Sequence, residues 1–161
     1  MAMTSYLKVT GKEQGELKGD CTQSGREDLI MVYAFDHKVE IPRDPHSGLP
    51  TGQRIHQPYE VTITKGKCSP QLFQACCTGE QVDTEHKFFR INDKGKEEHY
   101  FTIKLTNAII VEMREFNPLT FLDDTKPYQD MEMIRLTYEA IAWTQEIDGI
   151  ESEDSWKSPN E

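Results

Sequence analysis

Apolar and polar residues alternate with a period of two through much of this 161-residue chain. Tyr59, Val61 and Ile63 are separated by polar residues, and residues 101–105 and 109–113 repeat the pattern. Successive side chains of a β-strand point to opposite faces, so this alternation indicates strands with one buried face and one polar face. The chain is therefore predicted to be mostly β.

Turn signals between these segments predict antiparallel pairing. Residues 92–95, Asn-Asp-Lys-Gly, join a strand ending at Ile91 to a strand ending at Leu105. Thr106 and Asn107 are predicted to make the next reversal of the chain. The result is an antiparallel meander of several short strands.

Two segments depart from simple alternation. Residues 29–41 begin apolar on both faces and then alternate, which indicates a strand that runs from a covered region into a one-sided one. Between Ile134 and Trp143 the parity of the apolar residues changes. This change indicates either a β-bulge or burial on both faces, and the sequence does not distinguish the two.

One short helix is predicted near the middle of the chain. Ser69 is a suitable N-cap, Pro70 suits the first helical position, and Gly79 suits the stop after the last turn. Because the helix is short, it requires docking on a sheet to persist. The apolar stripe between these signals consists of Leu72, Phe73, Cys76 and Cys77.

Long irregular stretches separate and follow the strands. Residues 42–58 hold four of the eight prolines, and residues 117–130 form a second long polar connection. Loops of such length in a compact domain are usually functional or disordered. We expect one domain over residues 1–145. Residues 146–161 are expected to form a weakly ordered acidic tail with Trp156 as its one large anchor.

Charge and composition exclude several classes of function. The formal net charge is −10, with no local cluster of Lys and Arg, so binding to nucleic acid is not expected. No stretch approaches the roughly 20 apolar residues of a membrane span, so membrane insertion is not expected. The opening residues 1–8 lack the basic and apolar regions of a Sec-type signal, and the cysteines are expected to be reduced.

The chain lacks the residue patterns of an enzyme or a metal site. His46 and His56 share a loop without zinc-type spacing, and His37 is expected to be a half-buried, hydrogen-bonded imidazole. Cys76 and Cys77 are neighbours on a helix and make a poor chelating pair. There is no nucleophile elbow, P-loop or dinucleotide fingerprint. We therefore expect no enzymatic activity, no cofactor and no metal.

A series of short segments, in a specific order and spacing, carries a family resemblance over nearly the whole chain. The segments are residues 6–9, 41–42, 51–58, 69–72, 91–95, 100–105, 136–144 and 154–156. Together they resemble the hemolysin-coregulated protein (Hcp) family, the inner-tube subunits of type VI secretion systems. The adjacent cysteines in the helix are less typical of that family than small residues such as Ala or Ser.

The resemblance implies a fold and an assembly. The fold would be two antiparallel sheets forming a barrel-like β-domain with one short flanking α-helix. Family members form hexameric rings that stack into a tube, which a contractile sheath drives into a target cell behind a spike protein. Some members hold small effectors in the lumen of the ring. Such a protein is cytoplasmic during assembly and is then secreted without a signal peptide.

Candidate site residues follow from the resemblance together with the pattern. In the family the segment corresponding to residues 42–58 projects toward the next ring. The candidates for ring stacking are Leu49, Arg54, Ile55 and His56. Asp36 and Lys38 share a polar strand face and are candidates for lining the channel.

Two alternative functions are a ligand-binding barrel and a hydrolase. One is a monomeric β-barrel that binds a small ligand in an apolar cavity. The charged strand face at Asp36, Lys38 and Glu40 suits a wet channel better than such a cavity. The other is a hydrolase with a Cys–His pair, and the sequence contains no residue pattern that supports it.

Overall fold

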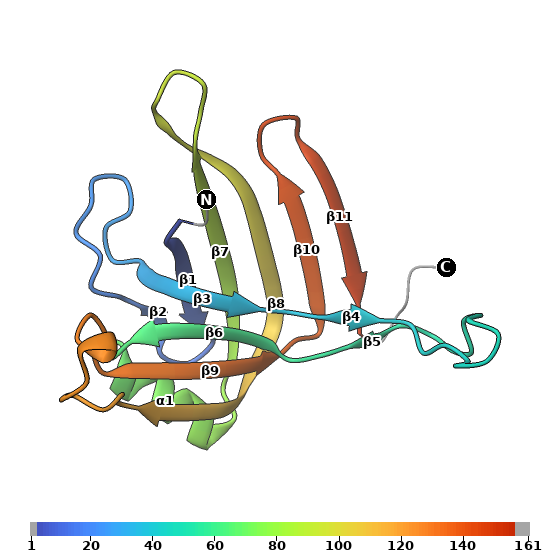
Figure 1. Cartoon of the computed structure of the whole chain (residues 1–161), viewed down its shortest axis with the longest axis horizontal. Coiled ribbons are helices and arrows are strands. Elements are labelled where there is room, and N and C mark those ends of the chain that lie inside the picture. Colours follow the sequence, from blue (N-terminus) through green and yellow to red (C-terminus); the bar gives the residue numbers. More distant parts are fainter. Residues whose placement is uncertain (1–2, 157–161) are drawn as a thin grey trace.

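The computed structural model describes residues 3–156 of the chain (Figure 1). None of the helices in this part of the chain is long and apolar enough to cross a membrane. The elements in chain order are β1 (Ser5–Gly11), β2 (Gly15–Leu17), β3 (Ile30–Asp36), β4 (Val39–Glu40), β5 (Ile55–His56), β6 (Tyr59–Thr64), α1 (Ser69–Thr78), β7 (Gln81–Ile91), β8 (Glu97–Phe116), the 3-10 turn η1 (Asp123–Thr125), β9 (Met131–Thr137), β10 (Ala140–Gln145) and β11 (Ile150–Ser155).

Six strands close into a barrel. Strands β8, β7, β1, β3, β6 and β9 pair in that order, and β9 pairs back onto β8. Every pairing is antiparallel. Strands β10 and β11 continue the sheet outward from β8, while β4 and β5 form a separate two-stranded ribbon (Figure 1). The predicted mostly β, barrel-like fold with one short helix is confirmed.

The barrel is filled by side chains from all of its strands. Alternation of apolar and polar residues along β6 gives alternating buried and half-exposed positions, as expected for a strand with one face on the core. Burial of apolar surface is the main favourable contribution to such a fold. The buried core comprises Leu7, Val9, Leu17, Ile30, Val32, Tyr59, Val61, Ile63, Cys68, Leu72, Ala75, Val82, Ile103, Leu105, Ala108, Ile110, Ile134, Leu136, Tyr138 and Ile141.

The reversal predicted at Thr106 and Asn107 is wrong, because β8 continues through both residues. Asn107 has a φ of 50°, a left-handed conformation that asparagine tolerates. Its N–H donates to Asp83 and its side-chain amide donates to Glu139, at 2.9 and 2.8 Å. The strand bends at this point instead of turning back, so that its first half pairs with β10 and its second half with β9.

The change of parity near the end of the chain marks a boundary between two strands. The chain leaves β9 at Thr137 and enters β10 at Ala140. The change of parity falls between Tyr138 and Ile141, at this boundary, so neither a β-bulge nor burial on both faces accounts for it. The segment beginning at residue 29 is only partly as predicted. Strand β3 starts buried at Ile30, but it is exposed on both faces from Tyr33 to Asp36, where burial of one face was expected.

The sequence predicted the C-terminal end of the helix correctly but not its N-cap residue. Gly79 caps α1 with a φ of 69°, and its N–H donates to the carbonyl of Ala75. Ser69 does not cap the helix, because α1 begins at Ser69 itself. Its hydroxyl instead donates to the buried carboxyl of Glu132 at 3.0 Å and accepts the N–H of Gly66 at 3.0 Å. A competing tertiary partner therefore takes the side chain that would otherwise bond the helix end.

The apolar stripe predicted for the helix is narrower than expected. Leu72 and Ala75 are buried against the barrel, and Cys76 is half-buried. Phe73 is 62% exposed and Cys77 is exposed, so their placement on the buried stripe is wrong. Adjacent residues of a helix point about 100° apart, and the barrel covers only one side of α1. All four cysteines are free thiols.

The C-terminal segment is better ordered than predicted. Residues 150–155 form β11, which pairs along its whole length with β10, so the expectation of a weakly ordered tail is wrong for these residues. Most of the side chains of β11 are exposed. Backbone hydrogen bonds to the edge of β10 hold the strand, and an acidic composition does not prevent this pairing.

Candidate functional site

A hairpin arm projects from the barrel at one end of its long axis. This arm, residues 41–54, lies between the short strands β4 and β5 (Figure 1). The N–H of Asp44 donates to the carbonyl of Leu49 at 2.9 Å, and the N–H of Thr51 donates to that of Pro42 at 2.8 Å. The long connection predicted at residues 42–58 is therefore largely an ordered hairpin that stands away from the core.

The tip of the arm is held by its own turn. The carboxylate of Asp44 accepts the N–H of His46 at 3.0 Å and the hydroxyl of Ser47 at 2.9 Å. These hydrogen bonds, the first of them most, lower the pKa of Asp44. Gly48 follows with a φ of 74°, a conformation that suits glycine. Leu49 is left 66% exposed at this preformed tip.

The base of the arm is fastened to the C-terminal strand. Arg54 binds the carboxylate of Asp154 with two nitrogens, one of them Nη2 at 2.9 Å from Oδ1. His56 is buried, and its Nε2 lies 2.8 Å from Oδ2 of the same carboxylate. The hydrogen bonds to Asp154 raise the pKa of Arg54, which keeps the guanidinium charged. Arg54 and His56 therefore anchor the arm within the chain.

A directed chain of hydrogen bonds continues inward from this anchor. A carboxylate only accepts, so neutral His56 carries its proton on Nε2 and accepts at Nδ1 from the hydroxyl of Tyr138, 2.6 Å away. The Tyr138 oxygen then accepts from Nε2 of His37 at 2.7 Å. His37 is thus the half-buried, satisfied imidazole that was predicted. Burial, and then the neighbouring His56, lower its pKa, against an opposing effect of Asp36.

Charged side chains form a row across the outer face of the barrel. Asp36 on β3 lies opposite Glu60 on β6, Glu60 lies opposite Arg135 on β9, and Arg135 lies opposite Glu112 on β8. Arg135 binds Glu60 at 3.0 Å and Glu112 at 2.9 Å. Lys38 follows the end of β3 and pairs with Glu40 at 2.9 Å. We call Asp36, Glu60, Arg135 and Glu112 the charged row.

The candidate residues predicted from the sequence lie in two separate places in the structure. Arg54 and His56 converge on Asp154, while Leu49 and Ile55 are exposed on the arm. Asp36 belongs to the charged row, and Lys38 lies beside it along one polar hollow. Sequence reasoning missed Asp154 and Tyr138 as partners of the arm. Partners about a hundred residues apart leave no local signal, and Tyr138 fitted an apolar pattern.

Two further titratable groups are buried within the barrel. Glu132 is fully buried, binds the hydroxyl of Ser69, and has a pKa raised chiefly by burial. His86 lies between the hydroxyls of Tyr59 and Ser5. Both groups are hydrogen-bonded to buried residues of the barrel and its helix, which indicates a structural role. Within residues 3–156, no group of three or more His, Cys, Asp or Glu could hold a metal ion.

Comparison with known families matches most of the chain to one of them. The family model described as "Type VI secretion system effector, Hcp" matches residues 6–145. A curated relative, the major exported protein of Pseudomonas aeruginosa, is 37% identical over 169 aligned positions. The alignment covers 99% of this chain and 98% of the relative.

Solved structures of the same family have the same fold. The Hcp1 protein of the E. coli EAEC 042 pathovar is similar with a TM-score of 0.84 and 33% identity, covering 96% of this chain and 99% of that one. The secreted protein Hcp3 from Pseudomonas aeruginosa has a TM-score of 0.77 and 31% identity, covering 94% and 99% respectively. The shared fold extends beyond the barrel, because these matches cover nearly the whole of both chains.

Proposed function

Because the chain belongs to the Hcp family of type VI secretion system proteins, we propose that it is a structural subunit of the secretion tube and not an enzyme. In this role it forms hexameric rings that stack into a tube inside a contractile sheath and behind a spike protein. Small effectors would travel in the lumen. The protein would assemble in the cytoplasm and leave the cell through the apparatus, without a signal peptide.

The arm is the observation that carries this proposal. An isolated monomer in water gains no stability from a projecting hairpin that has a preformed turn and an exposed Leu49. Its base is fixed by Arg54 and His56 on Asp154, so the arm is held in one direction before any partner binds. A rigid projection of this kind suits a repeating contact between identical subunits.

The barrel itself supports a structural role over ligand carriage. A small-ligand barrel places an apolar cavity at its centre, whereas the centre of this barrel is filled by its own core side chains. A barrel filled in this way suits a ring subunit.

The purified protein is expected to be a hexamer at micromolar concentration. Closing a ring covers the exposed edges and apolar side chains of each subunit, which favours assembly over the free monomer. Native mass spectrometry and light scattering would measure the mass directly. A single monomeric species under these conditions would overturn the proposal, since a tube subunit that does not self-associate has no function.

The charged row, with Lys38, is proposed to line the channel. Its side chains would then meet cargo first, and their charge would set which effectors are retained. The double variant Asp36→Lys with Lys38→Glu keeps the net charge and is expected to leave hexamers intact while changing effector co-purification several-fold. The matched control reverses Asp123 and Lys126, an exposed ion pair in the loop before β9. Unchanged retention in the first variant would show that the row faces solvent outside the ring.

A further inference from the structure

A chain of four side chains joins the base of the arm to the polar hollow at the end of β3. It runs from Asp154 through His56 and Tyr138 to His37, and consecutive polar atoms lie 2.8, 2.6 and 2.7 Å apart. His56 is only 5% exposed, whereas His37 lines the hollow and is half-buried. The chain therefore links an imidazole that water can reach with a buried one at the anchor of the arm.

The hydroxyl of Tyr138 determines how the two imidazoles share protons. It has one hydrogen and lies between two ring nitrogens, so it donates to one histidine and accepts from the other. When both rings are neutral, it donates to Nδ1 of His56 and accepts from Nε2 of His37. If His56 is charged, both of its nitrogens are donors, and the hydroxyl must donate to His37 instead. The charge of one imidazole therefore fixes the tautomer of the other.

We propose that this chain is a proton relay that tightens the anchor of the arm when the pH falls. A proton from water binds Nδ1 of His37 in the polar hollow. The Nε2 proton of His37 then passes to the oxygen of Tyr138, and the hydroxyl proton of Tyr138 passes to Nδ1 of His56. His37 and Tyr138 end neutral, and His56 carries the charge. The relay acts within one subunit and does not depend on the proposed assembly.

The contacts of His56 favour the charged form of its ring. Its Nε2 already bonds the carboxylate of Asp154, and a hydrogen bond between two ions is stronger than one from a neutral donor. The ring of Trp156 is stacked on that of His56 with 5.6 Å between centroids, and the face of an indole attracts a cation. The guanidinium of Arg54 on the same carboxylate opposes the charge. A carboxylate and an aromatic face together outweigh this one cation.

The surroundings of His37 disfavour a charge on its ring. Burial, and then the neighbouring His56, lower the pKa of His37, and the opposing effect of Asp36 is smaller. The ring of Tyr59 packs against His37, and burial raises the pKa of Tyr59, which keeps it neutral. Further charged side chains of the hollow and its rim are held in ion pairs, namely Lys38–Glu40, Arg135–Glu60 and Arg135–Glu112. His37 is therefore the entry point of the proton, and His56 is its resting place.

The charge strengthens the bond that fastens the arm. His56 belongs to β5 and Asp154 to β11, so a stronger bond between them holds the base of the arm to the C-terminal strand. The backbone at this base is closed by the N–H of Gln57, which donates to the carbonyl of Lys38 at 2.9 Å. Relative to its intrinsic rate, this amide is expected to exchange about tenfold more slowly at pH 5 than at pH 8, because local opening must break the strengthened bond.

NMR of isotope-labelled histidine nitrogens between about pH 8 and pH 5 tests the relay. As His56 becomes doubly protonated, the proton of His37 is expected to move from Nε2 to Nδ1 over the same pH range, while that ring stays neutral. In Tyr138→Phe, which lacks the hydroxyl, this change of tautomer should disappear. In His56→Gln, which keeps both hydrogen bonds but cannot be charged, exchange at Gln57 should no longer depend on pH beyond its intrinsic rate.

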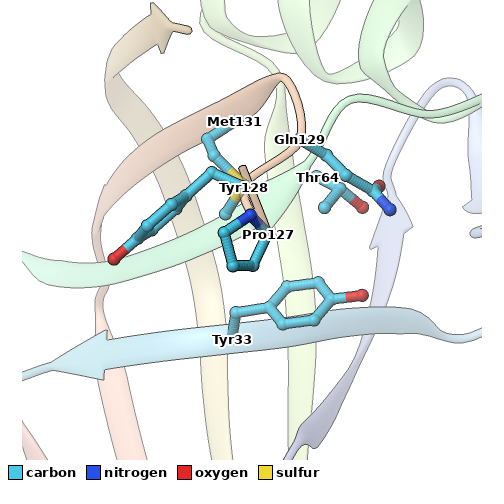
Figure 2. Close-up of a pocket in the computed structure, with 6 residues that line it drawn as sticks. All are labelled: Tyr33, Thr64, Pro127, Tyr128, Gln129 and Met131. Atoms are coloured by element: carbon cyan, nitrogen blue, oxygen red, sulfur yellow. The ribbon is translucent and has the colours of Figure 1, made fainter. Parts of the chain in front are cut away.

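A matched control removes the hydroxyl of a different tyrosine. Tyr128 is 59% exposed and lines an apolar hollow with Tyr33 and Pro127 (Figure 2). Tyr128→Phe should therefore show the same histidine titration and the same exchange at Gln57 as the parent protein.

Two results would overturn the proposal. Protonation of His37 to the imidazolium before His56, with its Nε2 proton retained, would show that no proton is passed along the chain. A change of tautomer at His37 without slower exchange at Gln57 would show that the charge does not tighten the anchor. Both measurements concern a single subunit, so native mass spectrometry tests the ring separately.

Discussion

Replacing residues 44–51 with a short Gly-Ser linker is expected to leave folding and hexamers intact while abolishing stacked tubes and secretion. The backbone hydrogen bonds of the arm are internal to it, so their removal leaves no unpaired group in the barrel. The replacement ends at Thr51 because Arg54 and His56 must stay on Asp154. A replacement extending to residue 56 would remove the anchor as well.

Three measurements follow the effect of shortening the arm. Thermal unfolding checks the fold, native mass spectrometry checks the ring, and electron microscopy with assay of the culture medium checks stacking and export. A control with Asp93→Gly and Lys94→Ser alters the tip of another exposed hairpin and should behave as the parent protein. If the shortened protein still stacked and was exported normally, the arm would be a spacer only.

Acidification from pH 6.5 to pH 4 is expected to cost the native state about 3 kcal/mol through a single residue, His86. The imidazole is fully buried among aromatic rings, including Phe35 and Phe88. Its Nδ1 lies 2.5 Å from the hydroxyl of Tyr59, and its Nε2 lies 2.7 Å from that of Ser5. Burial lowers the pKa of His86 from its ordinary 6.5 to about 3, because the charged form loses its hydration.

The direction of the effect follows from the proton balance. Below pH 6.5 the unfolded chain binds a proton at His86, while the folded protein takes one only near pH 3. The stabilising contribution is therefore complete above pH 6.5 and is lost progressively as the pH falls toward 3. Each unit of that range is worth about 1.4 kcal/mol, against a total stability of about 5–15 kcal/mol for a domain.

The variant His86→Gln isolates this contribution. Glutamine can hydrogen-bond to Tyr59 and Ser5 but does not titrate, so its stability should fall by about 3 kcal/mol less than that of the parent between pH 6.5 and pH 4. Urea unfolding at both pH values measures the difference. The control His46→Gln, at the exposed tip of the arm, should follow the parent. Parallel losses in the parent and in His86→Gln would show that the residue is protonated in the native state.

Local patterns predicted much of the barrel. The alternation around Tyr59 and Val61 produced the buried and exposed faces of β6, and the hairpin at residues 92–95 turns where its Asn and Gly indicated. Gly79 ends the helix as expected. These features depend on backbone geometry and on neighbours within a few residues, which are the interactions that a sequence pattern records.

The sequence could not predict the interactions that combine distant segments. Asn107 resembles a turn residue, but pairing of β8 with both β9 and β10 keeps the strand continuous. Ser69 is a residue type that favours the N-cap position, but its hydroxyl donates to Glu132 instead. In each case a local preference of about 1 kcal/mol is overridden by contacts that form only when the barrel closes.

The sequence by itself determined that this chain is a mostly β protein of the Hcp family with a long projecting segment. Only the tertiary structure decided what that segment does within the fold. Arg54 and His56 are polar residues of a loop in the sequence, and they become an anchor because β11 brings Asp154 beside them. Likewise Tyr33 and Pro127 meet in one groove because strand pairing around the barrel joins segments nearly a hundred residues apart. Periodicity reports which face of a strand is buried, whereas the identity of a partner depends on closure of the whole sheet.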